Sequence, residues 1–386
     1  MKKYTSYIEN NYSNELLLII ELSKHKPDRG KINQLVTHTD FESFYALTLK
    51  HRIVSHVLHH AELINQIIPA TYLDKLKKTK IEQAQRALNY TLYLIQIHEQ
   101  FETQSIQHCF FKGPMLSLQL YDDIGVRNFG DIDILVEKQD AEKAKEIIEE
   151  LNFECIYPKM KFTPKQQKVN YTISHHYHFK HRAKALDVEL HWNISNPKSY
   201  VGIETSEILR FSDNIHVSNR ILPYISHIQN LVYLSAHGAI HQWYRLFWLK
   251  DFSVLLNKST EKEIEEAWKL SKKLHLENCF IQACCMCNLY YDIIIPKSIP
   301  LKIDLLKVPV QSIFIGELKQ QGIKGMFRFI FYRLKLKRNL NYNFDLIFRL
   351  RTHLSDWEII KLPDFFFFLY YLLRPFILAY KLFIKK

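Results

Sequence analysis

The chain has 386 residues, of which 47% are apolar and 24% charged, so intrinsic disorder is excluded as its overall state. It contains only 9 glycines and 12 prolines, which argues against glycine-rich phosphate loops and strand-rich barrels and favours a mostly helical chain of two or three domains. The net charge of +12 favours anionic partners, namely nucleotides, nucleic acid or an anionic membrane surface, without choosing among them.

The first hundred residues predict helices. Apolar residues recur at helical spacing within Leu16–Leu22 and in a long segment from about Ile81 to Gln104. Glu21 interrupts the first run and no small-residue cleavage site follows it, so we expect no signal peptide. A reducing cytoplasm without disulfides is the expected compartment. Four cysteines crowd an apolar helical run, which favours core packing over a zinc site: Cys279, Cys284, Cys285 and Cys287.

The pattern changes at Ser105, where short strands and helices alternate. Lys112-Gly113-Pro114 breaks the first strand, and Pro114 suits the first turn of a helix. We expect strands at 106–111, 131–136, 153–157 and 185–192, and helices at 115–121 and 138–151. Residues 105–195 therefore predict a small α/β unit inside an otherwise helical protein, with the helical pattern resuming from Leu222 to about Leu334.

Asp131-x-Asp133 at the start of a strand is the strongest chemical signal. Residues i and i+2 of a strand point to the same face, so the two carboxylates repel each other unless a cation lies between them. Mg²⁺ prefers carboxylate and phosphate oxygens. In the strand 185–192, residues alternate strictly, and Glu189 lies on the polar face with Asp187 and His191. A two-metal arrangement needs a third carboxylate beside Asp131 and Asp133. Glu189 is the preferred candidate for it, and Asp187 is the alternative.

Other histidines leave their roles open. His191 could order Glu189, contact substrate or make a structural hydrogen bond. We expect the cluster Ser174–His178 to be a mobile or substrate-facing loop, because its histidines lack a zinc spacing. His237 and His241 lie four apart on one helix face without the glutamate of a zinc hydrolase. They predict either a wall of a nucleotide site or a buried polar network.

Three blocks of the chain resemble the uncharacterised nucleotidyltransferase family of the polymerase-β-like nucleotidyltransferase superfamily. The blocks are Phe111–Leu116 with Tyr121 and Arg127–Val136, then Val188–Trp192, and then His237–Asp251. A tail block, Leu362-Pro363 with Leu369–Pro375, is also similar, so the resemblance covers roughly 80–380. Glu189 stands where the family more often has aspartate, and Lys112-Gly113 replaces the superfamily's usual Gly-Ser.

This resemblance implies transfer of a nucleoside monophosphate from an NTP to a hydroxyl acceptor, with release of pyrophosphate. Asp131, Asp133 and Glu189 would then be catalytic residues that hold Mg²⁺, or Mn²⁺ in its place. Nucleotide contacts would come from Lys112, Gly113, Arg127, His191 and Arg245. For Arg127 the resemblance leaves two roles open, binding a phosphate or orienting Asp131 or Asp133. The acceptor would be a small molecule, a sugar or RNA.

The C-terminal tail has two interpretations. Phe365–Leu373 is an uncharged run of Phe, Leu and Tyr, followed by Arg374-Pro375 and then by Lys381 and a final Lys385-Lys386. An interfacial helix with basic anchors would give peripheral membrane contact through 363–386. A buried helix that caps the helical domain is the preferred alternative. The basic run Tyr332–Arg338 predicts a solvated face, with lipid head groups or RNA as alternative contacts.

The predicted fold class is α+β, with a small mixed-sheet polymerase-β-like nucleotidyltransferase core flanked by N- and C-terminal helical regions. The predicted segments are a helical region 1–80, the core 81–220, a helical domain 221–340 and a basic, aromatic tail 341–386. The alternative functions are a degenerate protein that binds a nucleotide or a partner without turnover, and a toxin-like transferase that acts on tRNA.

Overall fold

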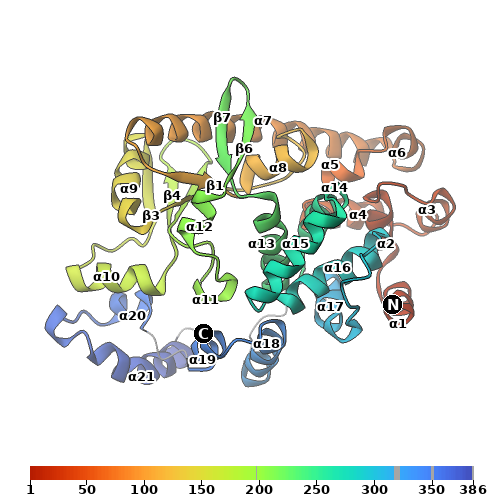
Figure 1. Ribbon diagram of the computed structural model, residues 1–386. Helices are drawn as coiled ribbons and strands as arrows, with labels where there is room; N and C mark the ends of the chain where they lie inside the picture. Colours follow the sequence, from red (N-terminus) through yellow and green to blue (C-terminus); the bar gives the residue numbers. More distant parts are fainter. Residues whose placement is uncertain (197, 317–321, 349–351, 385–386) are drawn as a thin grey trace. The chain divides into compact units, whose positions relative to one another are not determined.

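A computed structural model of the chain describes residues 1–196, 198–316, 322–348 and 352–384, and it confirms the α+β class (Figure 1). The chain divides into two compact units, each built from separated segments. The helical unit comprises Met1–Tyr93, Lys112–Gly130 and Ile225–Lys337. The sheet unit comprises Leu94–Phe111, Asp131–Tyr224 and Arg338–Lys386. The four-part division predicted from the sequence, with boundaries at about residues 80, 220 and 340, stays a prediction.

The sheet unit contains a seven-stranded mixed sheet of order β3-β4-β5-β2-β1-β7-β6. Its strands are β1 His108–Phe110, β2 Ile132–Val136, β3 Phe153–Tyr157, β4 His176–His181, β5 Asp187–His191, β6 Asp213–Val217 and β7 Arg220–Tyr224. The pairs β2/β5 and β1/β7 are parallel, and the other neighbours are antiparallel. The four expected strands are present, and β4, β6 and β7 are added to them.

Two sequence expectations near these added strands were wrong. The segment around His176 is a strand and not a loop, because its backbone pairs with β3 on one side and β5 on the other. The helical pattern expected from Leu222 begins only at His227, because Leu222 and Tyr224 belong to β7. Pro223 of that strand lacks an amide hydrogen, so it suits a strand near the sheet edge better than a helix interior.

The sheet unit also contains helices, and one of them, α9, packs on its strands. On α9, Glu142 accepts a hydrogen bond of 2.6 Å from the hydroxyl of Tyr177, which pairs with Leu190, so α9 covers the apolar face of β4 and β5. The helices are α9 Ala141–Glu150, α10 Pro164–Ile173, α11 Lys198–Val201, α12 Thr205–Arg210, α19 Leu340–Phe348, α20 Leu354–Ile359 and α21 Leu369–Ile384, with short 3₁₀ turns η1 Lys138–Asp140 and η3 Asp364–Phe366.

The helical unit confirms the helices expected at both ends of the core. Its elements are α1 Lys2–Asn11, α2 Asn14–Leu22, α3 Arg29–Val36, α4 Phe41–Lys50, α5 Val54–Val57, α6 Ala61–Ile67, α8 Gly113–Tyr121, α13 His227–Ile240, α14 Leu246–Lys258, α15 Glu261–Lys273, α16 Glu277–Tyr291, η2 Ile303–Leu305, α17 Lys307–Ile315 and α18 Gly322–Leu336. The long helix α7, Ala70–Thr103, begins in this unit and ends in the sheet unit.

The cysteine-rich run and the tail both lie in helices. The four cysteines of α16 are fully buried, which confirms the expected core packing. Burial raises the thiol pKa values of Cys284, Cys285 and Cys287, so these groups stay protonated. Among the described helices, none combines the length and the hydropathy that a bilayer crossing requires.

Candidate functional site

The polar face of three adjacent strands carries the predicted acids. In the order β4-β5-β2, Glu189 pairs with Asp133 on one side and with His178 on the other, and His191 pairs with His176. Residues at paired positions share a face, and so do residues two apart along a strand. Asp131 directly precedes β2 and therefore falls on the same face as Asp133. The face thus gathers acids and histidines from three separate segments.

Asp133, Glu189 and His191 form the closest group on this face. Nε2 of His191 lies 3.3 Å from Oδ1 of Asp133 and 3.2 Å from Oε2 of Glu189. Asp133 is only 2% exposed, whereas Glu189 is half-buried. Burial lowers the pKa of His191, but the two carboxylates more than offset this effect, so the net shift of the pKa is upward. When it is protonated, the imidazole of His191 balances charge on the two adjacent carboxylates.

These three side chains could also hold a metal ion. Their ligand atoms all lie within 4.8 Å of one another. Two carboxylates and an imidazole suit a divalent cation, and the carboxylate oxygens suit Mg²⁺ in particular. Asp131 is half-buried beside them and is not part of this group of three. Asp187, the alternative third acid, lies 3.5 Å from Nε2 of His178 and so has its partner on β4.

Histidines next to His191 extend this polar face, and the sequence pattern did not place them in the sheet. The ring centroids of His175 and His176 are 4.2 Å apart, and His176 lies 5.1 Å from His191. Burial, together with the charge of His191, lowers the pKa of His176 to about 4, so its ring is neutral near pH 7. On the other side, the ring of Phe111 packs edge-on against His191 at 4.9 Å. Alternation within 176–180 is the local sequence signal for β4, but it is too short to distinguish a strand from a loop without the partner strands β3 and β5.

In the helical unit, the Lys112-Gly113 break has an unusual backbone. Lys112 has a φ of 121° and Gly113 a φ of 50°, both in the region that favours glycine. The break leads into α8, with Pro114 in its first turn, as expected. A non-glycine residue held at such a φ is strained, and strain of this kind concentrates at functional positions. The amide groups at the start of α8 also favour an anion.

Arg127 has partners that the sequence did not suggest. Its Nε donates to Oδ2 of Asp251 at 2.8 Å, and Nη1 donates to the carbonyl of Gly113 at 3.0 Å. The hydroxyl of Tyr121 donates to the other carboxylate oxygen of Asp251 at 2.8 Å. Arg127 is 7% exposed and Asp251 is 2% exposed, so this is a buried network. It joins the first and third family-like blocks and fixes the carbonyl of Gly113.

The third block forms an aromatic and histidine cluster beside that network. The rings of His237 and His241 are 4.8 Å apart, and Trp248 packs against both, at 5.6 and 5.1 Å. The guanidinium of Arg245 lies 5.9 Å from the Trp248 ring. A cavity of about 20 Å³, roughly the space of one water, is lined by Lys112, Arg127, Leu234, His237, Trp248 and Asp251. The nucleotide-wall and polar-network interpretations of His237 and His241 both stay open.

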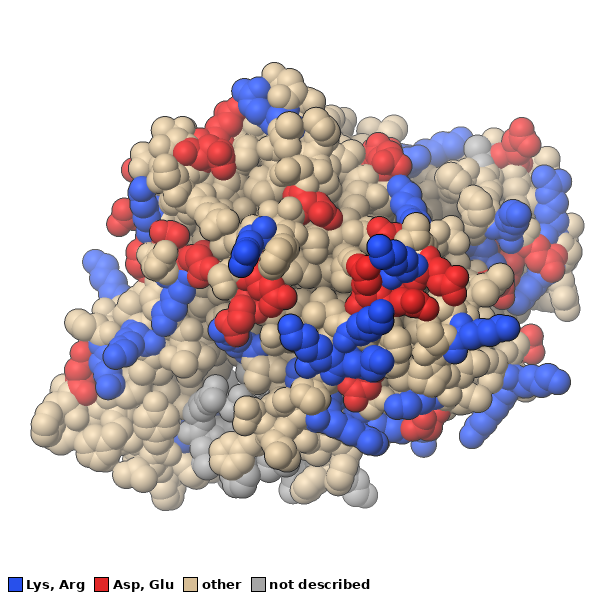
Figure 2. All heavy atoms as spheres, viewed as in Figure 1, with Lys and Arg blue, Asp and Glu red and all other residues tan. Residues whose placement is uncertain are grey.

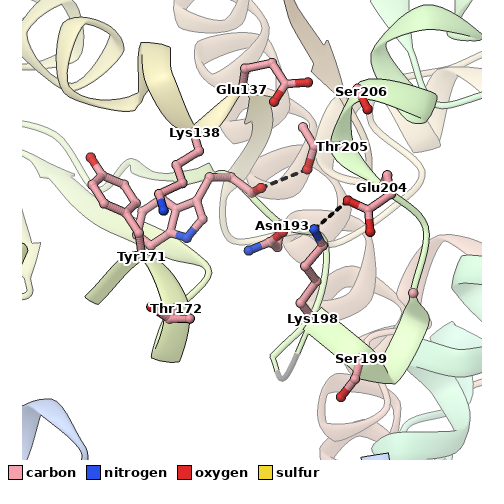
Figure 3. A pocket seen from close by; sticks show the side chains of 12 residues that line it. Glu137, Lys138, Tyr171, Thr172, Asn193, Lys198, Ser199, Glu204, Thr205 and Ser206 are labelled. Carbon is pink, nitrogen blue, oxygen red and sulfur yellow. Dashed lines mark hydrogen bonds and ion pairs between the residues drawn. The ribbon is translucent and has the colours of Figure 1, made fainter. Parts of the chain in front are cut away.

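A larger cavity of about 560 Å³ lies in the sheet unit where β2 and β5 end (Figure 3). Its lining residues are Glu137, Lys138, Tyr171, Thr172, Trp192, Asn193, Lys198, Ser199, Gly202, Glu204, Thr205 and Ser206. Lys198 pairs with Glu204, and Nζ of Lys138 lies 5.1 Å from the Tyr171 ring centroid. The acids Asp133 and Glu189 are not among the lining residues. Nothing in the sequence pattern predicted this cavity.

A comparison with known families gives a match over most of the chain. Residues 37–292 match the family described as "Uncharacterised nucleotidyltransferase". The matched range contains Lys112, Arg127, Asp131, Asp133, Glu189, His191, Arg245 and Asp251. It ends before the tail, so the similarity expected at Leu362–Pro375 lies outside it. A comparison with curated proteins found no match.

Proposed function

Because this chain belongs to the uncharacterised nucleotidyltransferase family, we propose that it transfers a nucleoside monophosphate from an NTP to a hydroxyl acceptor, releasing pyrophosphate. The observation that carries the proposal is the side-by-side placement of Asp133 and Glu189 on β2 and β5, with His191 between their carboxylates. Asp133 is buried and Glu189 is half-buried, so a divalent cation bound between these two like charges would offset their mutual repulsion more fully than the single charge that His191 can supply.

Asp131, Asp133 and Glu189 would hold Mg²⁺, or Mn²⁺ in its place. The fit is supported by the placement of these acids on one sheet face and by the short distances among Asp133, Glu189 and His191; Asp131 is assigned from the resemblance. When bound, such an ion stabilises charge on the reacting phosphate and lowers the pKa of the attacking hydroxyl. Asp133 is fixed by its place within β2, whereas the half-buried Glu189 can also accept the proton of an acceptor hydroxyl.

The triphosphate would be bound by Lys112, by the backbone of Gly113 and by the first turn of α8. The positive φ values at both residues turn the backbone sharply before the helix, and a glycine permits close approach of a phosphate. Arg127 supports this loop through the Gly113 carbonyl. We therefore propose that Arg127 acts by positioning the loop, and that Arg245 and His191 contact the nucleotide.

The acceptor is the open part of the proposal. RNA is one candidate, because the net charge of +12 favours a polyanion, and a tRNA-modifying transferase is its specific form. A sugar or another small hydroxyl compound is the other. A catalytically degenerate protein would bind the nucleotide and release no pyrophosphate. The absence of pyrophosphate would distinguish it from a transferase with either kind of acceptor.

The test is a thermal-shift screen of the four NTPs, each with and without Mg²⁺, on the wild-type protein and on Asp133→Asn. We expect one NTP to raise the melting temperature only with Mg²⁺, and only in the wild type. Asp187→Asn is the matched control, because it removes a carboxylate from the same face of β5 and should keep the shift. Metal-independent shifts, or equal shifts in Asp133→Asn, would contradict the proposed site.

A second step separates transfer from binding. The stabilising NTP, labelled at its α-phosphate, is incubated with total tRNA and, separately, with a panel of sugars and small alcohols. Label on one acceptor, with equimolar pyrophosphate, is the expected result. Binding without label transfer or pyrophosphate in any mixture would favour the degenerate alternative.

A further inference from the structure

The helix α21 presents uncharged, mostly apolar residues on its outward side, where an ordinary surface helix has charged ones. Its side toward the protein carries Tyr370, Ile377 and Arg374, all buried, and Arg374 forms an ion pair with the buried Asp356 of α20. Its outward side up to residue 380 carries no charge: Tyr371, Leu372, Pro375, Phe376, Leu378, Ala379 and Tyr380 are all exposed. A surface helix in water normally presents charged residues on its outward side. The outward side of α21 therefore suits an apolar environment.

The turn before this helix extends the same surface. Phe365, Phe366 and Phe368 are exposed by 82%, 45% and 56%. Between them Phe367 is buried in a small core, with Leu354, Trp357 and Tyr370. We call the exposed residues of 365–380 the tail face. A contiguous apolar surface of this kind marks an interaction site.

The tail face is held firmly by the rest of the sheet unit. Its small core packs against Tyr157, Met160, Phe162, Val169 and Ile173. Asp364 accepts hydrogen bonds from the hydroxyl of Thr163 and, at 3.2 Å, from the amide of Lys165. The inward part of the tail thus fits the buried-helix interpretation, while its outward part does not. These contacts hold the tail in its folded position while the aromatic side chains of the tail face stay exposed to solvent.

A basic rim borders the tail face. The segment that packs against it, 158–174, contains four exposed lysines and no acidic residue: Lys159, Lys161, Lys165 and Lys168. Lys361 is also exposed, between α20 and η3. Figure 2 shows this part of the molecule at the lower left, where the surface is mostly tan and is bordered by several blue side chains and by a smaller red group; Glu358 of α20 is an exposed acid of this region. The final Lys385-Lys386 lies outside the described residues.

We propose that the tail face docks on an anionic membrane surface, with α21 lying in the plane of the interface. Aromatic and aliphatic side chains enter the head-group boundary, and adjacent lysines contact anionic lipids, which is the pattern of interfacial helices. The described helices do not span a bilayer, so the contact is peripheral. A second copy of the chain is a poorer partner, because a symmetric dimer would place both lysine rims beside the same patch.

The test is sedimentation of the full-length protein with sucrose-loaded vesicles of phosphatidylcholine alone or with 30% phosphatidylglycerol. We expect binding to the anionic vesicles and little to the neutral ones, with loss at high salt. The double variant Phe365→Ser/Phe376→Ser should bind about tenfold more weakly. Both rings are exposed, by 82% and 73%, so their removal leaves the small core intact. Lys161→Glu/Lys165→Glu should remove the preference for anionic lipid.

The matched control is Ile294→Ser, which removes an apolar side chain that is 89% exposed in the helical unit. It should leave vesicle binding unchanged. Equal binding by all variants, or no binding by the wild type, would overturn the proposal. Light scattering without lipid measures whether the protein is a dimer in solution. If the wild type is a dimer and Phe365→Ser/Phe376→Ser is a monomer, the tail face is a self-association surface and the membrane proposal is wrong. None of these readouts depends on nucleotide transfer, so the proposal stands or falls separately from the proposed function.

Discussion

Asp133 on β2 and Glu189 on β5 occupy the same register position of two parallel strands, so their side chains lie beside each other on one face of the sheet. Fifty residues of chain separate the two strands, yet the strand pairing determines which carboxylate lies beside which. A shift of one residue in this register would turn Glu189 to the opposite face. Asp187 lies on the same face, two residues before Glu189, and pairs with Lys180 of β4, so the observed register is what places Glu189 and not Asp187 beside Asp133.

Glu189→Gln should weaken Mn²⁺ binding in the presence of the stabilising NTP by about 10–100-fold, because it replaces a charged oxygen ligand. Asp187→Asn should change this affinity less than about threefold, since Asp187 lies against His178 on β4. Isothermal titration with Mn²⁺ measures both. The opposite ranking of the two variants would make Asp187 the third acid.

Gly238→Ala should destabilise the helical unit by about 1–3 kcal/mol. A Cβ at this position of α13 would lie 2.3 Å from the ring of Trp243, which is fully buried and donates a hydrogen bond of 3.1 Å to Gln282. The ring has no room to move away. Urea unfolding measures the loss. Gly130→Ala is the control, because no atom lies within 4 Å of the added methyl group, and it should cost less than about 1 kcal/mol.

The sequence could predict the parts of the site that depend on local pattern. Strict alternation placed Glu189 and His191 on the polar face of a strand, and the pair Asp131-x-Asp133 followed from the period of two. Resemblance to the family added the general chemistry, which the match over 37–292 supports. The alternation and the Asp131-x-Asp133 pair can be recognised within a few consecutive residues, which is why the sequence alone was enough for them.

Features that depend on pairing between distant segments could not be predicted. Strand β4 is rich in histidine and is stable as a strand only because β3 and β5 lie on either side of it. Arg127 finds Asp251, which is 124 residues away along the chain, and no local pattern indicates that contact. The tail was expected to be either buried or interfacial, and the structure has a buried side and an exposed side on the same helix.

Arg127→Met should destabilise the protein by about 3–5 kcal/mol, because it leaves the carboxylate of Asp251 buried without its cation. Burial raises the pKa of Asp251, and Arg127 counteracts this rise. Loss of the arginine should therefore raise that pKa further. Denaturant unfolding of Arg127→Met, Asp251→Leu and the double variant measures the coupling. We expect the double variant to recover part of the loss, whereas additive losses would show that the pair contributes no coupling energy.

Lys337→Met should change how stability depends on alkaline pH. Lys337 is 2% exposed, and burial lowers its pKa to about 8. In the unfolded chain the amine keeps its proton up to about pH 10.4, so the unfolded state binds more protons between these two values. The wild type should therefore gain on the order of 2–3 kcal/mol relative to Lys337→Met as the pH rises from 7 to 10.

The neutral amine of Lys337 can still donate its 2.7 Å hydrogen bond to the carbonyl of Leu274, so deprotonation removes the cost of the buried charge without removing this contact. Urea unfolding at pH 7, 8, 9 and 10 measures the difference between the two proteins. Lys262→Met, at an exposed position of α15, is the control and should show no such trend. A constant difference between wild type and Lys337→Met across this range would mean that the buried amine keeps its ordinary pKa.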